Sequence, residues 1–407
     1  MNASSATAAP PLGAHIERLD DVLAATVASQ DAPFVVAAVA DTGGLRWSGT
    51  AGQDGTGEDV RLDAVFRIYS QTKAIGATAL LILVDRGLVS LDTPVAQLLP
   101  DFAGVHLLDS IGLSGPVLRA PRTECTVRHL LTHTSGLAYE GLDARMTAYR
   151  GATGDPVTGI LSLQTLLSYP FVFEPGSAFA YGVGVDWVGQ LVERLDGRRI
   201  DRFCAEEIFD PLGMTDTVFE PSDRPGRIPA VRQRTPSGGF RVVDVAPPEH
   251  PAIYGLGTCL YGTALDYLRF LRMVLGGGEL DGRRILSDAA VELLRTDQMP
   301  AGLSVSPITS DDHSWSCDIH PFPEVRKTWT AGFLRVEADV PGMRSAGTLS
   351  WGGILNTHYW VDPANNVAAV FMTQALPFVE PRFMDRYAQF ERAVYRDLVA
   401  DGEEDER

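Results

Sequence analysis

The stretch that decides the fold is VFRIYSQTKAIGATALLILVDRGL, residues 65–88. From Ser70 to about Asp85 it is apolar and rich in alanine, which predicts a helix, and Gly87 is placed as its C-cap. Ser70 and Lys73 fall in the first turn of that helix. Residues i and i+3 share one face of a helix, so the Lys73 amine can reach the Ser70 hydroxyl.

This Ser-x-x-Lys pair has the chemistry of an activated nucleophile. A serine hydroxyl is a poor nucleophile alone, and a neutral amine at hydrogen-bonding distance can take its proton. The free N–H groups of the helix start favour a developing oxyanion and disfavour an ammonium beside it. Among 34 basic residues only Lys73 and Lys327 are lysines, and arginine cannot replace a lysine that must become neutral. The alternative is a helix N-cap serine followed by a surface lysine.

The composition predicts a globular chain with two subdomains. The sequence has 407 residues, which exceeds what one hydrophobic core usually supports. Its net charge of −18 argues against nucleic acid and anionic membrane surfaces as partners, since both repel an acidic protein. Residues 1–15 lack the basic start and apolar core of a secretory signal, and the longest apolar run, 77–84, is too short to span a membrane.

The cysteines and histidines indicate neither disulfides nor a metal site. Four cysteines without CxxC spacing are scattered along the chain: Cys125, Cys204, Cys259 and Cys317. Buried thiols in a reducing cytoplasm are therefore predicted. His129 and His133 have a spacing that can bind zinc, but no glutamate lies between them in the required register. We interpret both as structural and expect no metal and no cofactor.

Strand patterns occur at both ends of the chain, and helical patterns lie between them. A helix is predicted at 14–29, followed by a hairpin of strands at 34–41 and 45–52. Further helices are predicted at 126–137, 160–169, 184–196, 200–209, 264–276 and 380–400, and further strands at 329–339, 345–351, 357–362 and 367–373. The Gly- and Pro-rich stretch 107–123 is predicted to be a loop, and DGEEDER at the end to be a frayed tail.

This order of elements predicts a fold of the α/β (α+β) class. One mainly antiparallel sheet is built from both ends of the chain and flanked by helices, with a helical domain inserted. Residues 1–75 and 255–407 are expected to form the sheet domain, and residues 76–254 the inserted helical domain.

Four stretches together resemble a known superfamily. They are FRIYSQTKAIGATALLILVDRGLVSLDTPV, TVRHLLTHTSGL, EPGSAFAYGVGVDWVGQLVE and GTLSWGG, which begin at residues 66, 126, 174 and 347. In order and spacing they resemble the serine β-lactamase-like superfamily, which includes class C β-lactamases, DD-peptidases, family VIII esterases and LovD-like acyltransferases. The resemblance covers roughly residues 15–400. It implies the β-lactamase/transpeptidase-like fold, with the active site in the cleft between the sheet and the helical domain.

The resemblance also implies roles for particular residues. Tyr181 is expected to approach Ser70 and to pass its proton to the leaving group. A phenol can do so only if positive charge stabilises its phenolate, and the Lys73 ammonium is a fitting partner. Whether Lys73 or Tyr181 is the base is left open, and Tyr181 as a packing residue is the alternative. The N–H groups of Ser70 and Ile354 are expected to form the oxyanion hole.

Two motifs depart from the lactamase pattern. Lactamases and DD-peptidases usually have Tyr-x-Asn, whereas Val183 stands at this substrate-binding position here. Val183 is expected to line the substrate site, but it cannot hold a substrate amide. The usual Lys-Thr-Gly is replaced by Trp351, Gly352 and Gly353, and an indole has no charge to attract a carboxylate. Both changes favour neutral esters or thioesters, and Trp-Gly-Gly resembles the family VIII and LovD-like members. The glycines let the strand edge lie close to the acyl group, and Trp351 as strand core is the alternative.

The sequence therefore predicts a serine carboxylesterase or acyltransferase that acts on a neutral ester through a Ser70 acyl-enzyme. Two alternatives stay open: a β-lactamase, DD-peptidase or amide hydrolase with the same residues, and a non-catalytic binding relative. Tyr139 is a further pocket candidate. Four aromatic residues are candidates for an apolar substrate wall or for ordinary core: Trp315, Phe322, Trp329 and Phe333. The expected partner is a small ester or acyl substrate, while its acyl group, the acceptor and the oligomeric state are left open.

Overall fold

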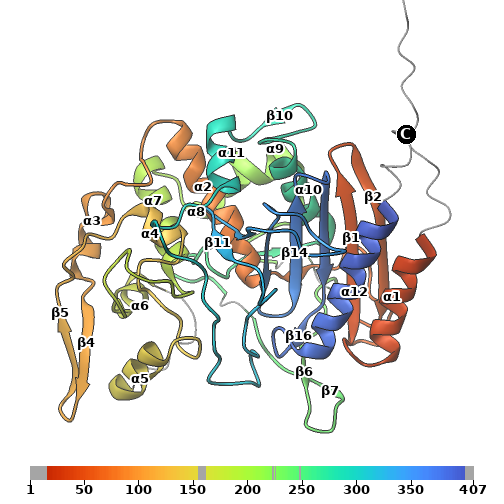
Figure 1. The fold of residues 1–407 in the computed structure, drawn as a ribbon, viewed down its shortest axis with the longest axis horizontal. Helices are drawn as coiled ribbons and strands as arrows, with labels where there is room; N and C mark the ends of the chain where they lie inside the picture. Colours follow the sequence, from red (N-terminus) through yellow and green to blue (C-terminus); the bar gives the residue numbers. More distant parts are fainter. Residues whose placement is uncertain (1–15, 155–161, 222–223, 225, 247–248, 399–407) are drawn as a thin grey trace, which may run out of the picture.

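The centre of the structure is a seven-stranded sheet (Figure 1). The computed structural model describes residues 16–154, 162–221, 224, 226–246 and 249–398. The strands lie in the order β11-β12-β13-β14-β15-β1-β2, and all neighbours are antiparallel. Their bounds are β1 (Phe34–Asp41), β2 (Gly44–Gly52), β11 (Lys327–Trp329), β12 (Leu334–Val336), β13 (Leu349–Gly353), β14 (Thr357–Asp362) and β15 (Val367–Met372). The predicted fold class, with one sheet made from both ends of the chain, is confirmed.

Strand β1 is buried on both faces of the sheet. Successive side chains of a strand point to opposite faces of the sheet, and the sequence of β1, FVVAAVAD, places apolar side chains on both faces. Val36 packs in the main core, whereas its neighbours Val35 and Ala37 pack in a second core on the other face. The sheet is therefore the middle layer of three.

Helices form the two outer layers (Figure 1). On the outer face, α1 (Ile16–Ala28) packs on β2 and lies beside α12 (Pro381–Leu398). On the inner face, α10 (Ala264–Leu275) packs on β1, β14 and β15. The helix with the Ser-x-x-Lys pair, α2 (Thr72–Asp85), belongs to this inner side and packs against α7 (Gly184–Asp196).

The described elements between residues 95 and 196 lie to one side of the sheet and form a helical half (Figure 1). The other helices are α3 (Val95–Leu98), α4 (Val127–Leu131), α5 (Ala144–Thr153), α6 (Leu163–Leu167), α8 (Ile200–Cys204), α9 (Asp210–Leu212) and α11 (Asp288–Arg295). The other strands are β3 (Phe66–Arg67), β4 (Leu107–Gly112), β5 (Gly115–Arg119), β6 (Arg232–Arg234), β7 (Phe240–Val242), β8 (Tyr261–Gly262), β9 (Glu279–Leu280), β10 (Arg283–Arg284) and β16 (Ala375–Leu376). The helices predicted at 184–196 and 264–276 are confirmed as α7 and α10.

The prediction of a loop at 107–123 is wrong for most of that stretch. Strands β4 and β5 pair there as a hairpin that projects from the helical half (Figure 1). Most side chains of this hairpin are exposed or half-buried, and Leu113 at its tip is fully exposed. A hairpin without a buried face has no alternation of apolar and polar residues, so the sequence pattern did not reveal it.

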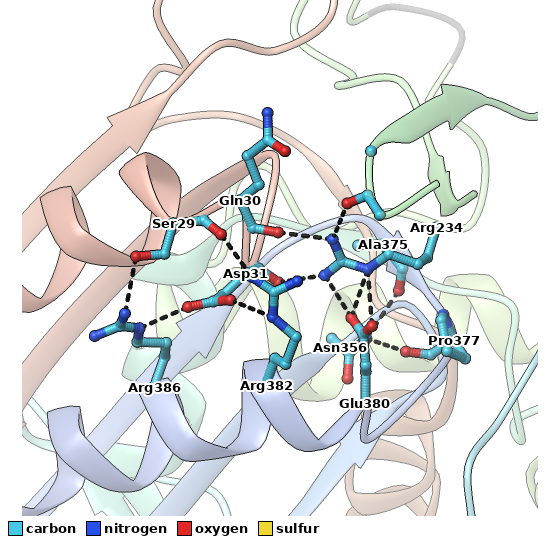
Figure 2. Close-up of polar contacts among 12 residues, drawn as sticks. Ser29, Gln30, Asp31, Arg234, Asn356, Ala375, Pro377, Glu380, Arg382 and Arg386 are labelled. Carbon is cyan, nitrogen blue, oxygen red and sulfur yellow. Dashed lines mark hydrogen bonds and ion pairs between the residues drawn. The ribbon is translucent and has the colours of Figure 1, made fainter. Parts of the chain in front are cut away.

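A polar network fixes the start of α12 to the end of α1 (Figure 2). The buried Asp31 carboxylate accepts hydrogen bonds from Arg382 Nε at 2.9 Å and from Arg386 Nε at 2.8 Å. Beside it, Arg234 of β6 pairs with Glu380 at 2.5 Å and donates to the Asp31 carbonyl oxygen at 3.2 Å. The network therefore joins segments from the beginning, the middle and the end of the chain.

Some predictions concern residues outside the described ranges. These are the absence of a signal in residues 1–15, the frayed tail 401–407 and the first part of the helix predicted at 160–169. The division into domains 1–75 with 255–407 and 76–254 remains a prediction. Within the described ranges, no helix is long and apolar enough to cross a membrane.

A buried ion pair yields a prediction about stability. Arg344 binds the Glu391 carboxylate of α12 through two hydrogen bonds of 2.7 Å, and the two side chains are 2% and 0% exposed. Glu391→Ala leaves the guanidinium buried and unpaired, so we expect the free energy of unfolding in urea to fall by about 3–5 kcal/mol. The control is Asp288→Ala, which removes a 94% exposed partner of Arg284 and should change little. Equal, small changes in both variants would contradict the prediction.

Candidate active site

Ser70 lies where a 3-10 turn leads into helix α2. The turn covers Tyr69–Gln71 and α2 begins at Thr72, so the predicted helix is confirmed, with Ser70 in the turn two residues before its first residue. Lys73 Nζ lies 3.1 Å from Ser70 Oγ. Both residues are buried, at 2% and 8% exposure. Tyr69 has a φ of 42°, a strained backbone conformation of the kind found at functional sites.

The Lys73 amine has three oxygen partners. Besides Ser70 Oγ they are Tyr139 OH at 3.1 Å and the Gly257 carbonyl oxygen at 2.9 Å. A carbonyl can only accept, so one N–H belongs to Gly257, whereas a hydroxyl can accept or donate. The same geometry therefore suits an ammonium that donates three times and a neutral amine whose lone pair faces the Ser70 O–H. Lys73 can take the Ser70 proton without moving.

Tyr139 and Tyr181 come from two segments that pair through their backbones. Tyr139 N donates to Tyr181 O at 3.1 Å and Val183 N donates to Leu137 O at 3.0 Å, which brings the two phenol rings to 5.5 Å. A Cβ on Gly182 would lie 1.9 Å from the Leu137 oxygen, so the pairing requires glycine there. Burial raises the pKa of Tyr139 well above its ordinary value. Val183 is predicted to line the substrate site, but its side chain is fully buried and exposes no surface to a substrate.

Tyr181 and Trp351 are joined by a hydrogen bond within an aromatic cluster. Trp351 Nε1 donates to Tyr181 OH at 2.9 Å, and the rings lie 4.9 Å apart. The ring centres of Trp329 and Trp351 are 4.8 Å apart, and those of His133 and Tyr181 are 4.6 Å apart. Lys73 Nζ lies 4.9 Å from the Tyr181 ring centre. Because an indole N–H only donates, the Tyr181 oxygen accepts, and its own proton stays available to another acceptor.

The end of strand β13 lies against the segment that leads into Ser70. A Cβ on Gly353 would lie 2.2 Å from the Ile68 carbonyl oxygen, so only glycine permits this approach. At Gly352 a Cβ would also be crowded, at 2.9 Å from the nearest side-chain atom. Ile354 follows in the turn to β14 and is half-buried. An oxyanion hole made by the N–H groups of Ser70 and Ile354 remains a prediction.

Asp186 and Gly257 were not identified from the sequence. Asp186 Oδ1 accepts a hydrogen bond from Gly257 N at 2.8 Å, while Gly257 O accepts one from Lys73. Burial raises the pKa of Asp186 to about 6, although the Lys73 charge and the Gly257 N–H oppose the rise. The available signals were an acidic residue in the apolar first turn of a helix and a Gly-x-Gly at 255–257.

The two histidines of the second motif have structural positions, as predicted. His129 Nδ1 accepts from Thr126 N at 3.2 Å, which completes a capping box at the start of α4. His133 packs in the aromatic cluster, and burial together with the Lys73 charge lowers its pKa well below the ordinary value. Among the described residues, no group of three or more His, Cys, Asp or Glu side chains is placed to hold a metal ion.

A cavity lies beside the aromatic cluster, and the four aromatic wall candidates differ in their relation to it. The cavity measures about 420 Å³, and its lining includes Phe322, Trp351 and Gly352. It extends along α12 to the Arg344–Glu391 pair, and Ser70, Lys73 and Tyr181 are not part of its lining. Trp329 is buried against Trp351, whereas Phe333 is fully buried against Tyr359 in the core and Trp315 is 42% exposed. Only Phe322 among the four candidates lines this cavity.

The fold and this site define a serine acyl-transfer architecture of the β-lactamase type. Residues 19–394 match the family model described as Beta-lactamase, and the chain belongs to this family. The predicted membership in the serine β-lactamase-like superfamily, as an enzyme, is confirmed.

The similar proteins include esterases and acyltransferases. "Acyltransferase calJ" of Penicillium decumbens is 32% identical over 332 residues, 79% of this chain and 78% of that protein. "Lovastatin esterase" of Penicillium rubens is 30% identical over 355 residues, 84% of this chain and 87% of that protein. The structure of simvastatin synthase from Aspergillus terreus, LovD6 mutant, has a TM-score of 0.81 at 26% identity and covers 97% of this chain and 99% of its own.

The buried Asp186 carboxylate yields a pH-dependent stability prediction. Its pKa is raised on folding, so the protonated form stabilises the fold, and that contribution is complete below about pH 4 and lost as the pH rises through about 6. Asp186→Asn has no such loss. The stability of the wild type relative to this variant, followed by thermal unfolding, should therefore decrease from pH 4 to pH 7 by up to about 3 kcal/mol. A difference that stays constant over this range would contradict the prediction.

Proposed function

We propose that the protein is a serine carboxylesterase or acyltransferase that forms an acyl-enzyme on Ser70 from neutral esters. The observation that carries the proposal is the 3.1 Å contact between Lys73 Nζ and Ser70 Oγ at a buried helix start. The names of the relatives, an acyltransferase and an esterase, support the same class of reaction. Hydrolysis and transfer use the same first half-reaction and differ in whether water or another alcohol accepts the acyl group.

In the first half-reaction Ser70 Oγ attacks the ester carbonyl carbon while its proton passes to Lys73 Nζ. The bond from the carbonyl carbon to the alcohol oxygen then breaks, and the alcohol leaves with the proton of Tyr181. The Trp351 N–H stabilises the phenolate this creates, and Lys73 returns a proton to it. The oxyanion is stabilised by the N–H groups of Ser70 and Ile354.

In the second half-reaction an acceptor O–H attacks the acyl-enzyme carbonyl. The same groups work in reverse, so the acceptor proton is removed and Ser70 Oγ leaves with a proton. Tyr139, held neutral by burial, keeps its hydrogen bond to Lys73 at 3.1 Å throughout and orients the amine.

The preference for neutral substrates rests on what surrounds the nucleophile. Trp351 supplies one N–H and an aromatic face where a lysine would attract a carboxylate. A small ester or acyl compound is therefore the proposed partner. The four free cysteines support the predicted cytoplasmic location.

The proposal predicts a covalent adduct on Ser70. Incubation with a fluorophosphonate should add one label, detected by intact mass and assigned to Ser70 by peptide mapping. Ser70→Ala should take no label. Lys73→Arg should lose at least about 100-fold in labelling rate although it keeps the charge, because arginine cannot accept the proton. A label elsewhere, or rapid labelling of Lys73→Arg, would reject the mechanism, and no label at all would favour a non-catalytic relative.

A comparison of substrates separates esterase from lactamase activity. We expect kcat/KM for a p-nitrophenyl ester to exceed that for nitrocefin by about 100-fold or more, a difference of at least ~2.7 kcal/mol in transition-state binding. The reason is that nitrocefin carries a carboxylate and the third motif carries no lysine. Dominant turnover of nitrocefin would instead support the β-lactamase alternative.

A further inference from the structure

Asp186 is a buried carboxylate, and packing alone does not explain why a charged group lies at this position. It is 0% exposed, and of its two oxygens Oδ1 binds Gly257 N, whereas Oδ2 has no hydrogen-bond partner among the described residues. Burial of a carboxylate without full hydrogen bonding destabilises a fold unless a positive charge lies near. The charge that acts on Asp186 is that of Lys73.

The simplest explanation is that Asp186 stabilises the start of its own helix. It lies in the first turn of α7, where a negative charge is favourable. However, the side chain also reaches another segment, where its Oδ1 accepts a hydrogen bond from Gly257 N. Neither packing nor the helix start requires a carboxylate that binds Gly257, the residue whose carbonyl oxygen binds Lys73.

Glycines on three segments bring Asp186 and Lys73 to the two sides of Gly257. A Cβ on Gly257 would lie 2.6 Å from Asp186 Oδ2, so the carboxylate occupies the space that a side chain would take. On α2 and α7, Gly76 and Gly189 make room for Leu256, whose side chain would lie only 2.9 Å and 3.3 Å from a Cβ at these positions. The 255–257 segment can therefore lie between the two helices, with Gly257 N toward Asp186 and Gly257 O toward Lys73.

We propose that Asp186 is a positioning residue for Lys73: its carboxylate holds the Gly257 carbonyl oxygen against the amine and stabilises the ammonium that forms when the amine takes the Ser70 proton. The arrangement acts as the acidic member of a catalytic triad does, since that residue orients the base and stabilises its charged form. The inference rests on the proposed function, because it assumes that Lys73 accepts the Ser70 proton.

Other titratable groups also face this pair. From the segments packed around it these are His133, Tyr139, Glu140, Tyr169, Tyr181 and Cys259. Burial lowers the pKa of His133 and raises the pKa of Tyr139, Tyr169 and Cys259, so these four are neutral at pH 7. Glu140 is bound by Tyr169 OH at 3.0 Å. Asp186 is thus the carboxylate best placed to respond to the charge of Lys73.

The test is the rate of Ser70 acylation by p-nitrophenyl acetate as a function of pH in wild type and Asp186→Asn. The amide keeps an oxygen for Gly257 N but removes the charge, so the ammonium of Lys73 is less stabilised. In Asp186→Asn the midpoint of the acidic limb of the pH–rate profile should therefore lie about 1 pH unit lower than in the wild type. The maximal rate should fall about 10- to 100-fold, because the amine is then a weaker base.

The matched control is Asp266→Asn. Asp266 is also a buried first-turn carboxylate, on α10, and it accepts from Asp216 N at 2.7 Å, but it has no contact with Lys73. This variant should leave the acidic limb unchanged. A slower Asp186→Asn with an unmoved limb would reduce Asp186 to a packing role and overturn the inference. A wild type that is not acylated on Ser70 would instead overturn the proposed function itself.

A second measurement decides the question if Asp186→Asn does not fold. The carboxyl carbon of Asp186 is titrated by ¹³C NMR in wild type and in Lys73→Met, which leaves the surroundings of Asp186 in place. Loss of the lysine charge should raise the midpoint by about 1 unit. An unchanged midpoint would overturn the coupling between the two residues.

Discussion

The Lys73 amine is bound by oxygen atoms from three separate parts of the chain, and the rest of the site depends on this constraint. Ser70 belongs to the same turn, whereas Tyr139 and Gly257 are 66 and 184 residues away in the sequence. An amine that is 2% exposed has given up its water and requires these partners. The site therefore forms only after α2, the helical half and the 255–257 segment have packed together.

An interaction could be predicted from the sequence when its two residues lie close together along the chain. Ser70 and Lys73 lie in one helical turn, where spacing alone sets their distance, and the strands at both ends are marked by their apolar runs. The contacts of Tyr139 with Lys73 and of Asp186 with Gly257 depend on how distant segments pack, which no local pattern encodes. The β4–β5 hairpin was missed for the opposite reason: beyond Leu107 and Leu108 its side chains are exposed or half-buried, so its residues show no alternating buried face.

Glycines control how closely the segments of the site approach one another. At Gly182, Gly257 and Gly353 a Cβ would lie 2.6 Å or less from a neighbouring oxygen. These contacts fix the backbone framework, and the side chains upon it can then differ between members of the family. Trp351 is an example: on this framework an indole that binds Tyr181 takes the place of the lysine of the lactamase motif, and the preference that we propose for neutral esters needs no change of fold.

The pairing of α1 with α12 has a consequence for the topology of the chain. Arg18 in the first helix donates to Asp397 in the last at 3.2 Å, so the described chain returns to its starting point. The first and last helices of the described chain are thus neighbours in space, which is the condition for circular permutation. The exposed turn between β4 and β5 is a natural alternative opening, so a circular permutant that begins there and joins the two helices by a short linker retains every contact of the sheet.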